Sequence, residues 1–188
     1  MNLADIYRLA DTKRWQIVKT AKPQSVAEHM YAVAMIARRI GMAIGMTKAE
    51  IADCVEWALW HDVPEVYTGD IAAPVKQHMY EACGGDPLAG LERKLCGEEY
   101  TEIEHRSLYE NGGIIRRVVK LADLMEAIKF LQQNACTDHG HLVKAKIWDA
   151  MGRIIDASPA QFPDFKWLGV RDIMAELIGP ETSVDDLL

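Results

Sequence analysis

The sequence contains few cysteines, and their spacing excludes two classes of small protein. Four cysteines occur among 188 residues, at positions 54, 83, 96 and 136, and no two of them form a C-x-x-C pair. Disulfide-rich scaffolds and cysteine-based zinc sites both need closer or paired spacing. We therefore expect reduced thiols in a cytoplasmic protein.

Long apolar runs are also missing. No stretch approaches the roughly 18 consecutive apolar residues of a membrane helix, and no basic segment followed by an apolar run opens the chain. We therefore expect neither a membrane span nor a secretion signal.

Positive charge is scarce. The chain has 21 Lys and Arg residues against 28 Asp and Glu residues, for a net charge of −7. A protein that binds a nucleic-acid backbone needs a basic face, so no nucleic-acid polymer is expected as a partner. Phosphate contacts, if present, must come from a few well-placed cations.

Segments with the alternating pattern of a β-strand are absent, and apolar residues recur at helical spacing instead. With 49% apolar residues, the chain is long enough for one domain with its own core. We expect a single all-α domain over residues 1–188, with a loose acidic tail from about residue 180. The expected helices cover 3–10, 26–44, 48–63, 75–82, 87–109, 114–134, 141–157 and 169–178.

Two capping boxes fix helix starts near the middle of the chain. Ser25 is followed three residues later by Glu28, and Thr47 by Glu50, so each pair can satisfy the free N–H groups of a first turn. Pro64 disfavours helical geometry at the preceding residue, so the second of these helices should end or kink there. Residues 65–74 read as a turn-rich loop.

The pair His61-Asp62 is the most informative feature of the chain. The apolar stripe of its helix runs through residues 51, 54, 55 and 58, and helical periodicity continues it to 61 and 62. A buried imidazole beside a buried carboxylate is costly unless both are paired. A divalent metal would satisfy both, and the alternative is an ordinary hydrogen-bonded His–Asp pair in the core.

Two further polar residues interrupt apolar helical faces. His29 lies in the first turn of its helix, and Asp123 stands within the run VVKLADLMEAIKFL. Separately, His29 could be a partly buried histidine, and Asp123 could pair with Lys120 three residues earlier. Together with His61 and Asp62 they form a ligand set that suits Mn²⁺, Co²⁺, Fe²⁺, Ni²⁺ or Zn²⁺.

The H…HD…D series resembles the HD-domain phosphohydrolase superfamily. Longer stretches are similar to bacterial 5′-deoxynucleotidases and to phage dATP or dNTP phosphohydrolases; they are KRWQIV, SVAEHMYAVAMIA, WHDVPEVYTGDIAAPVK and VKLADLMEAI. These segments span much of residues 13–130. The resemblance implies an all-helical HD domain in which His29, His61, Asp62 and Asp123 hold one metal ion.

The resemblance also implies two catalytic carboxylates. Glu65 would position or deprotonate the attacking water, a role that its place one turn beyond the metal pair also favours. Asp70 would lie near the sugar and phosphate. The alternatives are a solvated loop carboxylate for Glu65, and an Asx-turn or helix N-cap for Asp70.

The resemblance also implies substrate-binding residues, because Arg14 and Trp15 match an Arg-Trp pair that precedes the metal histidine in the family. Arg14 would clamp phosphate, because a planar guanidinium suits bidentate contact, and Trp15 would pack on the deoxyribose and reject a 2′-hydroxyl. Ile17 is expected to line the base pocket, with core packing as the alternative. Lys76 and Lys120 are candidate phosphate cations, or else ordinary surface charges.

The expected function is that of a metal-dependent 5′-deoxynucleotidase, which releases phosphate from a deoxynucleoside monophosphate. A dATP triphosphohydrolase that uses the same residues is the alternative, and a non-catalytic helical binding module is less favoured. A phosphodiesterase with two metals would need extra histidines, and only His78 and His105 lie between the HD pair and Asp123. His139-Gly-His141 reads as a loop with capping histidines.

The resemblance implies a homo-oligomer, at least a dimer. Five tryptophans and nine methionines are many for one small core, and both residue types are enriched at interfaces. Trp148 and Trp167 lie in segments that the catalytic motifs do not use. We therefore expect a helical interface that involves the C-terminal third.

Overall fold

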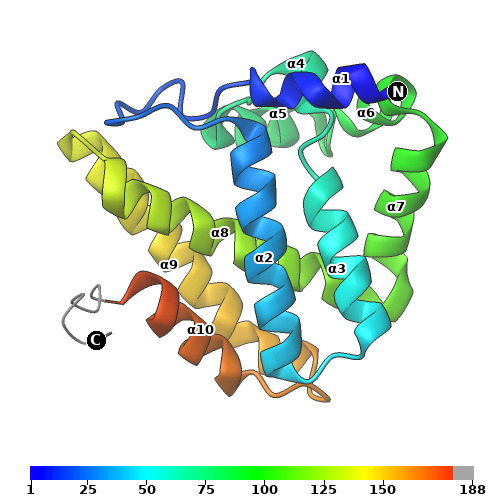
Figure 1. The fold of residues 1–188 in the computed structure, drawn as a ribbon, viewed down its shortest axis with the longest axis vertical. Helices are drawn as coiled ribbons and strands as arrows, with labels where there is room; N and C mark the ends of the chain where they lie inside the picture. Colours follow the sequence, from blue (N-terminus) through cyan, green and yellow to red (C-terminus); the bar gives the residue numbers. More distant parts are fainter. Residues whose placement is uncertain (180–188) are drawn as a thin grey trace.

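Helices form the regular structure of residues 1–179, which are the residues that the computed structural model describes, apart from the side chains of residues 111 and 112 (Figure 1). Among these residues there is no strand, and only two isolated bridges pair Lys13 with Ser25 and Thr20 with Ala135. The predicted all-α fold is confirmed. The helices are α1 (Leu3–Tyr7), η1 (Arg8–Ala10), α2 (Val26–Ile44), α3 (Lys48–Trp60), α4 (Glu65–Thr68), α5 (Ala73–Cys83), α6 (Ala89–Cys96), α7 (Glu98–Tyr109), η2 (Glu110–Gly113), α8 (Ile114–Asn134), α9 (Asp138–Gln161) and α10 (Leu168–Ile178).

Both capping boxes are present. The Ser25 hydroxyl accepts from the Glu28 amide at 3.2 Å, and the Glu28 carboxylate accepts from the Ser25 amide at 2.7 Å. Thr47 and Glu50 repeat the arrangement at the start of α3. Helix α2 ends at Ile44, as predicted, because Gly45 adopts φ 87°, a left-handed conformation that stops a helix.

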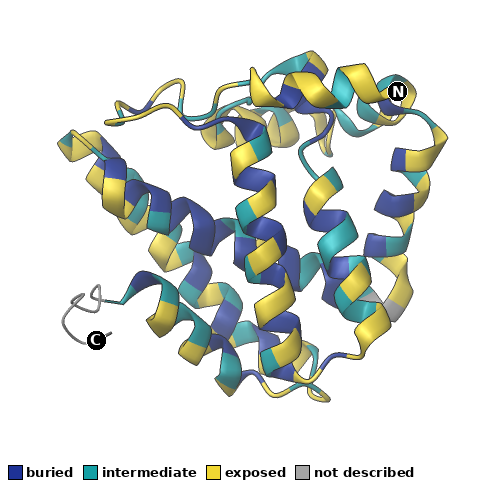
Figure 2. Cartoon of the chain, in the orientation of Figure 1, coloured by how far each residue is buried: buried dark blue, intermediate teal, exposed yellow. Residues whose placement is uncertain are grey.

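Helix α8 is the centre of the core. It packs against α2, α3, α9 and α10, and Figure 1 shows it crossing behind α2 and α3. Val118, Leu121 and Met125 on α8 are fully buried, and dark blue surfaces face inward along all these helices (Figure 2). Burial of each such side chain stabilises the fold by about 1.5–3 kcal/mol. The core therefore fixes how α2, α3 and α8 approach one another.

Four sequence-based boundaries were wrong. Residues 65–68 form the short helix α4 rather than a loop, because Pro64 has helical φ and ψ and serves as its N-cap. Gly97, with φ 87°, splits the expected 87–109 helix into α6 and α7. Helix α9 begins at Asp138, capped by Thr137, so His139 and His141 lie in its first turn rather than in a loop. The same helix was expected to end at about residue 157, but α9 continues to Gln161, with Pro159 inside its last turn.

The predicted loose tail from about residue 180 falls outside the described residues. Within residues 1–179, none of the helices combines the length and apolar character that crossing a bilayer requires.

Candidate metal and phosphate site

The four predicted metal ligands come from three helices and meet in one place. His29 lies in the first turn of α2, His61 and Asp62 follow the last residue of α3, and Asp123 lies in the middle of α8. His29 Nε2 is 3.5 Å from Asp62 Oδ2 and 3.5 Å from Asp123 Oδ1, and His61 Nε2 is 3.4 Å from Asp62 Oδ2. One ligand atom from each of His29, His61 and Asp123 lies within 4.8 Å of the others. The arrangement brings two imidazole nitrogens and two carboxylates around one point.

Both imidazoles are oriented by a partner behind them. His61 Nδ1 lies 2.8 Å from the carbonyl oxygen of Ala58, and His29 Nδ1 lies 2.6 Å from Glu126 Oε2. Carbonyl and carboxylate oxygens accept only, so we assign the ring proton to Nδ1 in each case. The Nε2 atoms are buried and have no hydrogen-bond partner within the described structure. In the neutral form of each ring, Nε2 therefore carries the lone pair and directs it at the cluster, as metal-ligating histidines do.

The charges of the cluster favour a bound cation. Burial lowers the pKa of His61, which keeps its imidazole neutral. Burial raises the pKa of Asp123, but Lys120 and the two imidazoles outweigh it and hold that pKa below its usual range. Burial and Arg14 lower the pKa of His29, whereas Asp62, Glu126 and Asp123 together raise it to about 9. The raised pKa of His29 shows that the surrounding carboxylates favour a positive charge near Nε2. A divalent ion would supply that charge, and it suits a set of two imidazole and two carboxylate donors.

Glu65 lies beside the cluster at the start of α4. Its amide donates to the carbonyl oxygen of Asp62 at 3.0 Å, so a tight turn at Pro64 carries the chain from the metal pair to this carboxylate. Oε1 accepts from Lys76 Nζ at 2.9 Å, and Oε2 is buried without a hydrogen-bond partner. Burial and the neighbouring Asp62 raise the pKa of Glu65 to about 8, against the opposing effect of Lys76. A carboxylate with a pKa near neutrality is suited to general base work.

Arg14 and Trp15 lie on the segment between η1 and α2. Arg14 Nη1 donates to Glu126 Oε2 at 3.2 Å, while its Nε is buried without a hydrogen-bond partner. Trp15 has φ 64°, which is unusual for a large side chain and costs on the order of 1–3 kcal/mol. Its indole stacks on Phe130, with ring centroids 5.8 Å apart, and its Nε1 donates to Gln24 Oε1 at 2.8 Å. These contacts hold Trp15 in its strained conformation.

Asp70 supports this segment rather than capping a helix. Its Oδ2 accepts from the Trp15 amide at 3.3 Å, whereas the N-cap of α5 is Ala72 and has no side-chain cap. Ile17 is 59% exposed, so the alternative of core packing for Ile17 is wrong, and its base-pocket role stays a prediction. Lys120 makes the ion pair that its spacing allows, with Nζ 2.7 Å from Asp123 Oδ2.

Comparison with known proteins identifies the family of this chain. A family model described as 5′-deoxynucleotidase YfbR-like matches residues 2–83. A dATP triphosphohydrolase from Acinetobacter phage SH-Ab 15497 is 35% identical, over 100% of this chain and 97% of the relative. The chain belongs to the HD-domain phosphohydrolases. A 5′-deoxynucleotidase from Vibrio parahaemolyticus serotype O3:K6 is 28% identical, over 78% of this chain and 81% of its own length.

A solved member of the HD-domain phosphohydrolases has the same fold. The Cyanophage S-2L HD phosphohydrolase, bound to dA and one catalytic Zn²⁺ ion, is 28% identical and superposes with a TM-score of 0.76. The match covers 95% of this chain and 94% of that one. The fold and the enzyme class expected from the sequence are therefore confirmed.

Sequence reasoning missed two residues of this HD-domain site. Glu126 contacts both His29 and Arg14, and Gln24 Nε2 donates to Glu126 Oε1 at 2.5 Å. Glu126 follows Asp123 by three residues on an apolar helix, so it lies on the same face, and that spacing could have pointed to it. Nothing in the local pattern marked Gln24. His78 and His105 lie outside the cluster; His78 contacts the carbonyl oxygen of Pro74, and His105 packs on Tyr109.

Proposed function

We propose that this protein hydrolyses 2′-deoxynucleotides with one divalent metal held by His29, His61, Asp62 and Asp123. The observation that carries the proposal is the pair of buried Nε2 atoms without hydrogen-bond partners, each beside a carboxylate that needs a cation. When bound, such an ion polarises a phosphoryl oxygen and makes water more acidic. Co²⁺, Mn²⁺, Fe²⁺, Ni²⁺ and Zn²⁺ all suit this ligand set.

The protein's own groups divide the remaining work. Glu65 takes a proton from the attacking water, for which its buried Oε2 has no competing partner. Arg14, Lys76 and Lys120 offset the charge of the phosphates, and Lys76 is already drawn toward the site by Glu65. Asp70 holds the backbone of Trp15, whose indole packs on the sugar and leaves no room for a 2′-hydroxyl. Ile17 lines the base pocket.

For the substrate we favour dATP, with deoxyadenosine and triphosphate as products. The support is the relative that matches the whole chain and is named a dATP triphosphohydrolase. Three cations around one metal cluster also suit a chain of phosphates better than a single one. The monophosphatase reaction is the second candidate, and the YfbR-like match over residues 2–83 favours it.

Deoxyadenosine is a product of both reactions, so the assay that separates them must identify the phosphate product that is released. Purified protein is given dATP, dAMP, ATP and AMP with Co²⁺, Mn²⁺, Fe²⁺, Ni²⁺ or Zn²⁺ in turn, and phosphate, pyrophosphate and triphosphate are quantified separately. Triphosphate equal to the deoxyadenosine formed from dATP supports the first reaction. Phosphate from dAMP, with dATP untouched, supports the second. No hydrolysis of any deoxynucleotide with any of the five metals would overturn the proposed function.

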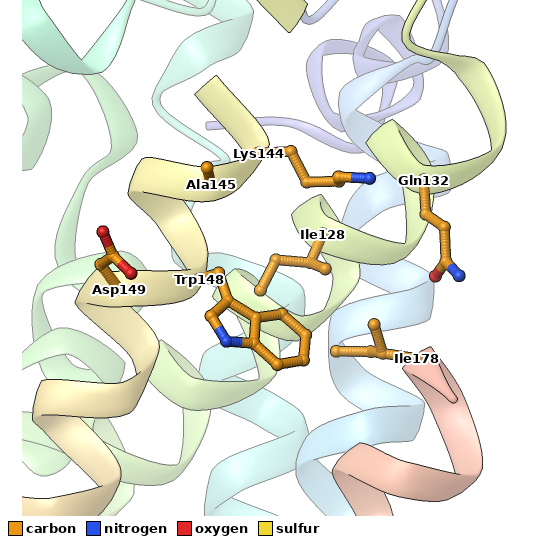
Figure 3. Close-up of a pocket in the computed structure, with 7 residues that line it drawn as sticks. All are labelled: Ile128, Gln132, Lys144, Ala145, Trp148, Asp149 and Ile178. Atoms are coloured by element: carbon orange, nitrogen blue, oxygen red, sulfur yellow. The ribbon is translucent and has the colours of Figure 1, made fainter. Parts of the chain in front are cut away.

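We also propose a homo-oligomer, at least a dimer, with α9 and α10 in its interface. Trp148 is 43% exposed and lies in an apolar hollow of about 300 Å³ between α8, α9 and α10, next to Ile128 and Ile178 (Figure 3). The expectation that Trp167 contributes to the interface was wrong, since Trp167 is 5% exposed and packs in the core. Light scattering at micromolar concentration tests the proposal, and a monomer mass contradicts it. Trp148→Glu should lower the mass, whereas Tyr109→Glu, on an exposed site of α7, should not.

A further inference from the structure

One carboxylate oxygen accepts hydrogen bonds from both a predicted metal ligand and a predicted substrate-binding residue. Glu126 Oε2 accepts from His29 Nδ1 at 2.6 Å and from Arg14 Nη1 at 3.2 Å. The other oxygen, Oε1, accepts from Gln24 Nε2 at 2.5 Å. Glu126, His29 and Gln24 are buried, so solvent does not compete for these bonds. We propose that Glu126 is a positioning residue that sets both the ring of His29 and the direction of the Arg14 guanidinium.

The chemistry of a carboxylate explains why this position holds Glu. A carboxylate accepts only, so His29 must carry its proton on Nδ1 and direct its Nε2 lone pair at the cluster. The negative charge also makes Nε2 more basic, as carboxylate partners of metal-bound histidines do. A glutamine at this position could turn its amide NH₂ toward Nδ1, and the proton would then move to Nε2 and block metal binding.

The same carboxylate orients Arg14. Its bond with Nη1 uses one edge of the guanidinium, while Nε stays buried without a partner. The five N–H donors of an arginine lie in one plane and point in fixed directions, so a bond at Nη1 determines where the other four point. This part of the proposal, the orientation of Arg14, rests on the proposed function, because the N–H donors of Arg14 that Glu126 does not bind are the ones that would contact phosphate.

A chain of three hydrogen bonds extends this link to the sugar side. Gln24 donates to Glu126 with its Nε2 and accepts from Trp15 Nε1 with its Oε1. The order is therefore Trp15, Gln24, Glu126 and His29, from the substrate segment to the metal. These hydrogen bonds, in addition to the packing of the helices, therefore fix the position of the metal ligand relative to the substrate residues.

A purely structural role is the competing explanation, and the chain offers a matched control. Glu104 on α7 is a buried carboxylate that also holds arginines, with Arg93 Nε at 2.6 Å and Arg116 Nη2 at 3.3 Å. It has no contact with the four ligands among its hydrogen bonds or ion pairs. Glu104→Gln should therefore reproduce the structural cost of losing a buried carboxylate without the effect on the site.

The experiment compares Glu126→Gln, Glu126→Asp and Glu104→Gln in the full chain. Co²⁺ affinity is measured by calorimetry, the Co²⁺ visible spectrum is recorded, and kcat and KM are determined with the deoxynucleotide that wild type hydrolyses. Glu126→Gln should lower Co²⁺ affinity by about 10–100-fold, alter the spectrum and raise KM through Arg14. Glu126→Asp should recover part of the affinity, and Glu104→Gln should leave it unchanged.

Three results would overturn the inference. They are an unchanged Co²⁺ affinity in Glu126→Gln, equal losses in Glu126→Gln and Glu104→Gln, and a His29 proton on Nε2. The last is read without any variant, by ¹⁵N NMR of histidine side chains in Zn²⁺-loaded wild type, which should show the proton on Nδ1. If wild type is active and any of these results is obtained, only the role of Glu126 is contradicted, and the proposed function stands. A wild type that neither binds Co²⁺ nor hydrolyses deoxynucleotides sinks the proposed function instead.

Discussion

The proposed metal side of the site (His29, His61, Asp62 and Asp123) and its proposed substrate side (Arg14, Trp15 and Lys76) are built from different kinds of structure. His29, His61 and Asp123 stand on or at the end of α2, α3 and α8, which pack together around the core. Arg14 and Trp15 belong to a segment with little regular structure, and Lys76 comes from α5, in which no residue is buried. Ligands need distances fixed to a few tenths of an ångström, and packed helices supply that precision.

The substrate side has a different requirement. The segment of Trp15 lies outside the regular helices. Its order comes from one small apolar cluster, in which Trp15 packs with Val18 and Phe130, and from polar contacts of Trp15 with Asp70 and Gln24. Contacts this few hold the segment less tightly than the packed core holds the helices of the metal side. We therefore expect substitutions on the metal side to abolish the reaction, and substitutions on the substrate side to change its selectivity.

The largest effect is expected for Asp123→Ala. Removal of a metal ligand should lower Co²⁺ affinity by more than the roughly 10–100-fold typical for loss of a supporting partner, and activity should fall to background. The metal-free protein should keep its fold, because the change also removes one of two neighbouring, partly buried carboxylates. Calorimetry and circular dichroism test both parts. Asp156→Ala, an exposed carboxylate on α9, is the control; retained Co²⁺ binding in Asp123→Ala would show that Asp123 is not a ligand.

Glu65→Ala should separate chemistry from metal binding. Loss of general base work lowers kcat by about 10²–10⁴, while Co²⁺ affinity and KM stay close to wild type. Glu65 lies next to the metal pair but is not one of the four converging ligands. Steady-state kinetics on metal-saturated protein measure the split. A kcat near that of wild type would transfer the base role to another residue.

The features that were predictable from the sequence are those that depend on nearby residues. Helix starts at Ser25 and Thr47 and the end of α2 at Ile44 follow local rules of capping and periodicity. The convergence of His29, His61, Asp62 and Asp123 could be expected because each interrupts an apolar stripe, and such stripes face one core. These predictions use information within a few residues of each position.

Features that depend on distant contacts were not predictable in this way. Glu126 meets Arg14 across 112 positions in the sequence, and no local pattern encodes that pairing. The left-handed conformation of Trp15 is accompanied by contacts with Asp70 and Phe130, which are 55 and more positions away in the sequence, and with Gln24 on the same segment. Gly97 did carry a local signal for the break between α6 and α7, but helical periodicity on both sides outweighed it.

On the substrate side, Trp15→Ala should change sugar selectivity. If the indole packs against C2′, wild type strongly prefers deoxynucleotides, and the variant narrows the preference by about 10–100-fold, mainly by admitting the ribonucleotide. Metal affinity should change much less than in Glu126→Gln, because Trp15 contacts no ligand directly and Glu126 keeps its bond with His29. The ratio of kcat/KM for dATP and ATP, or for dAMP and AMP, is the measurement. Equal wild-type rates on the deoxy- and ribonucleotide would remove this role from Trp15.

The last effect concerns the stability of the metal-free protein, and it tests Glu65, which lies between the proposed metal ligands and Lys76. Its pKa is about 8 in the folded protein and near 4.5 when unperturbed, so between these values the folded chain keeps a proton that the unfolded chain has lost. Stability must then fall as pH rises from about 4.5 to about 8, by at most about 1.4 kcal/mol per pH unit. Glu65→Gln cannot titrate and lacks this contribution. The free energy of unfolding of both proteins is measured in urea with a chelator present. The variant should become more stable relative to wild type as pH rises across that window. His29 and the other groups titrate in both proteins, so their contributions cancel in the difference. Parallel curves from pH 5 to pH 8 would mean that Glu65 is ionised at neutral pH without a metal.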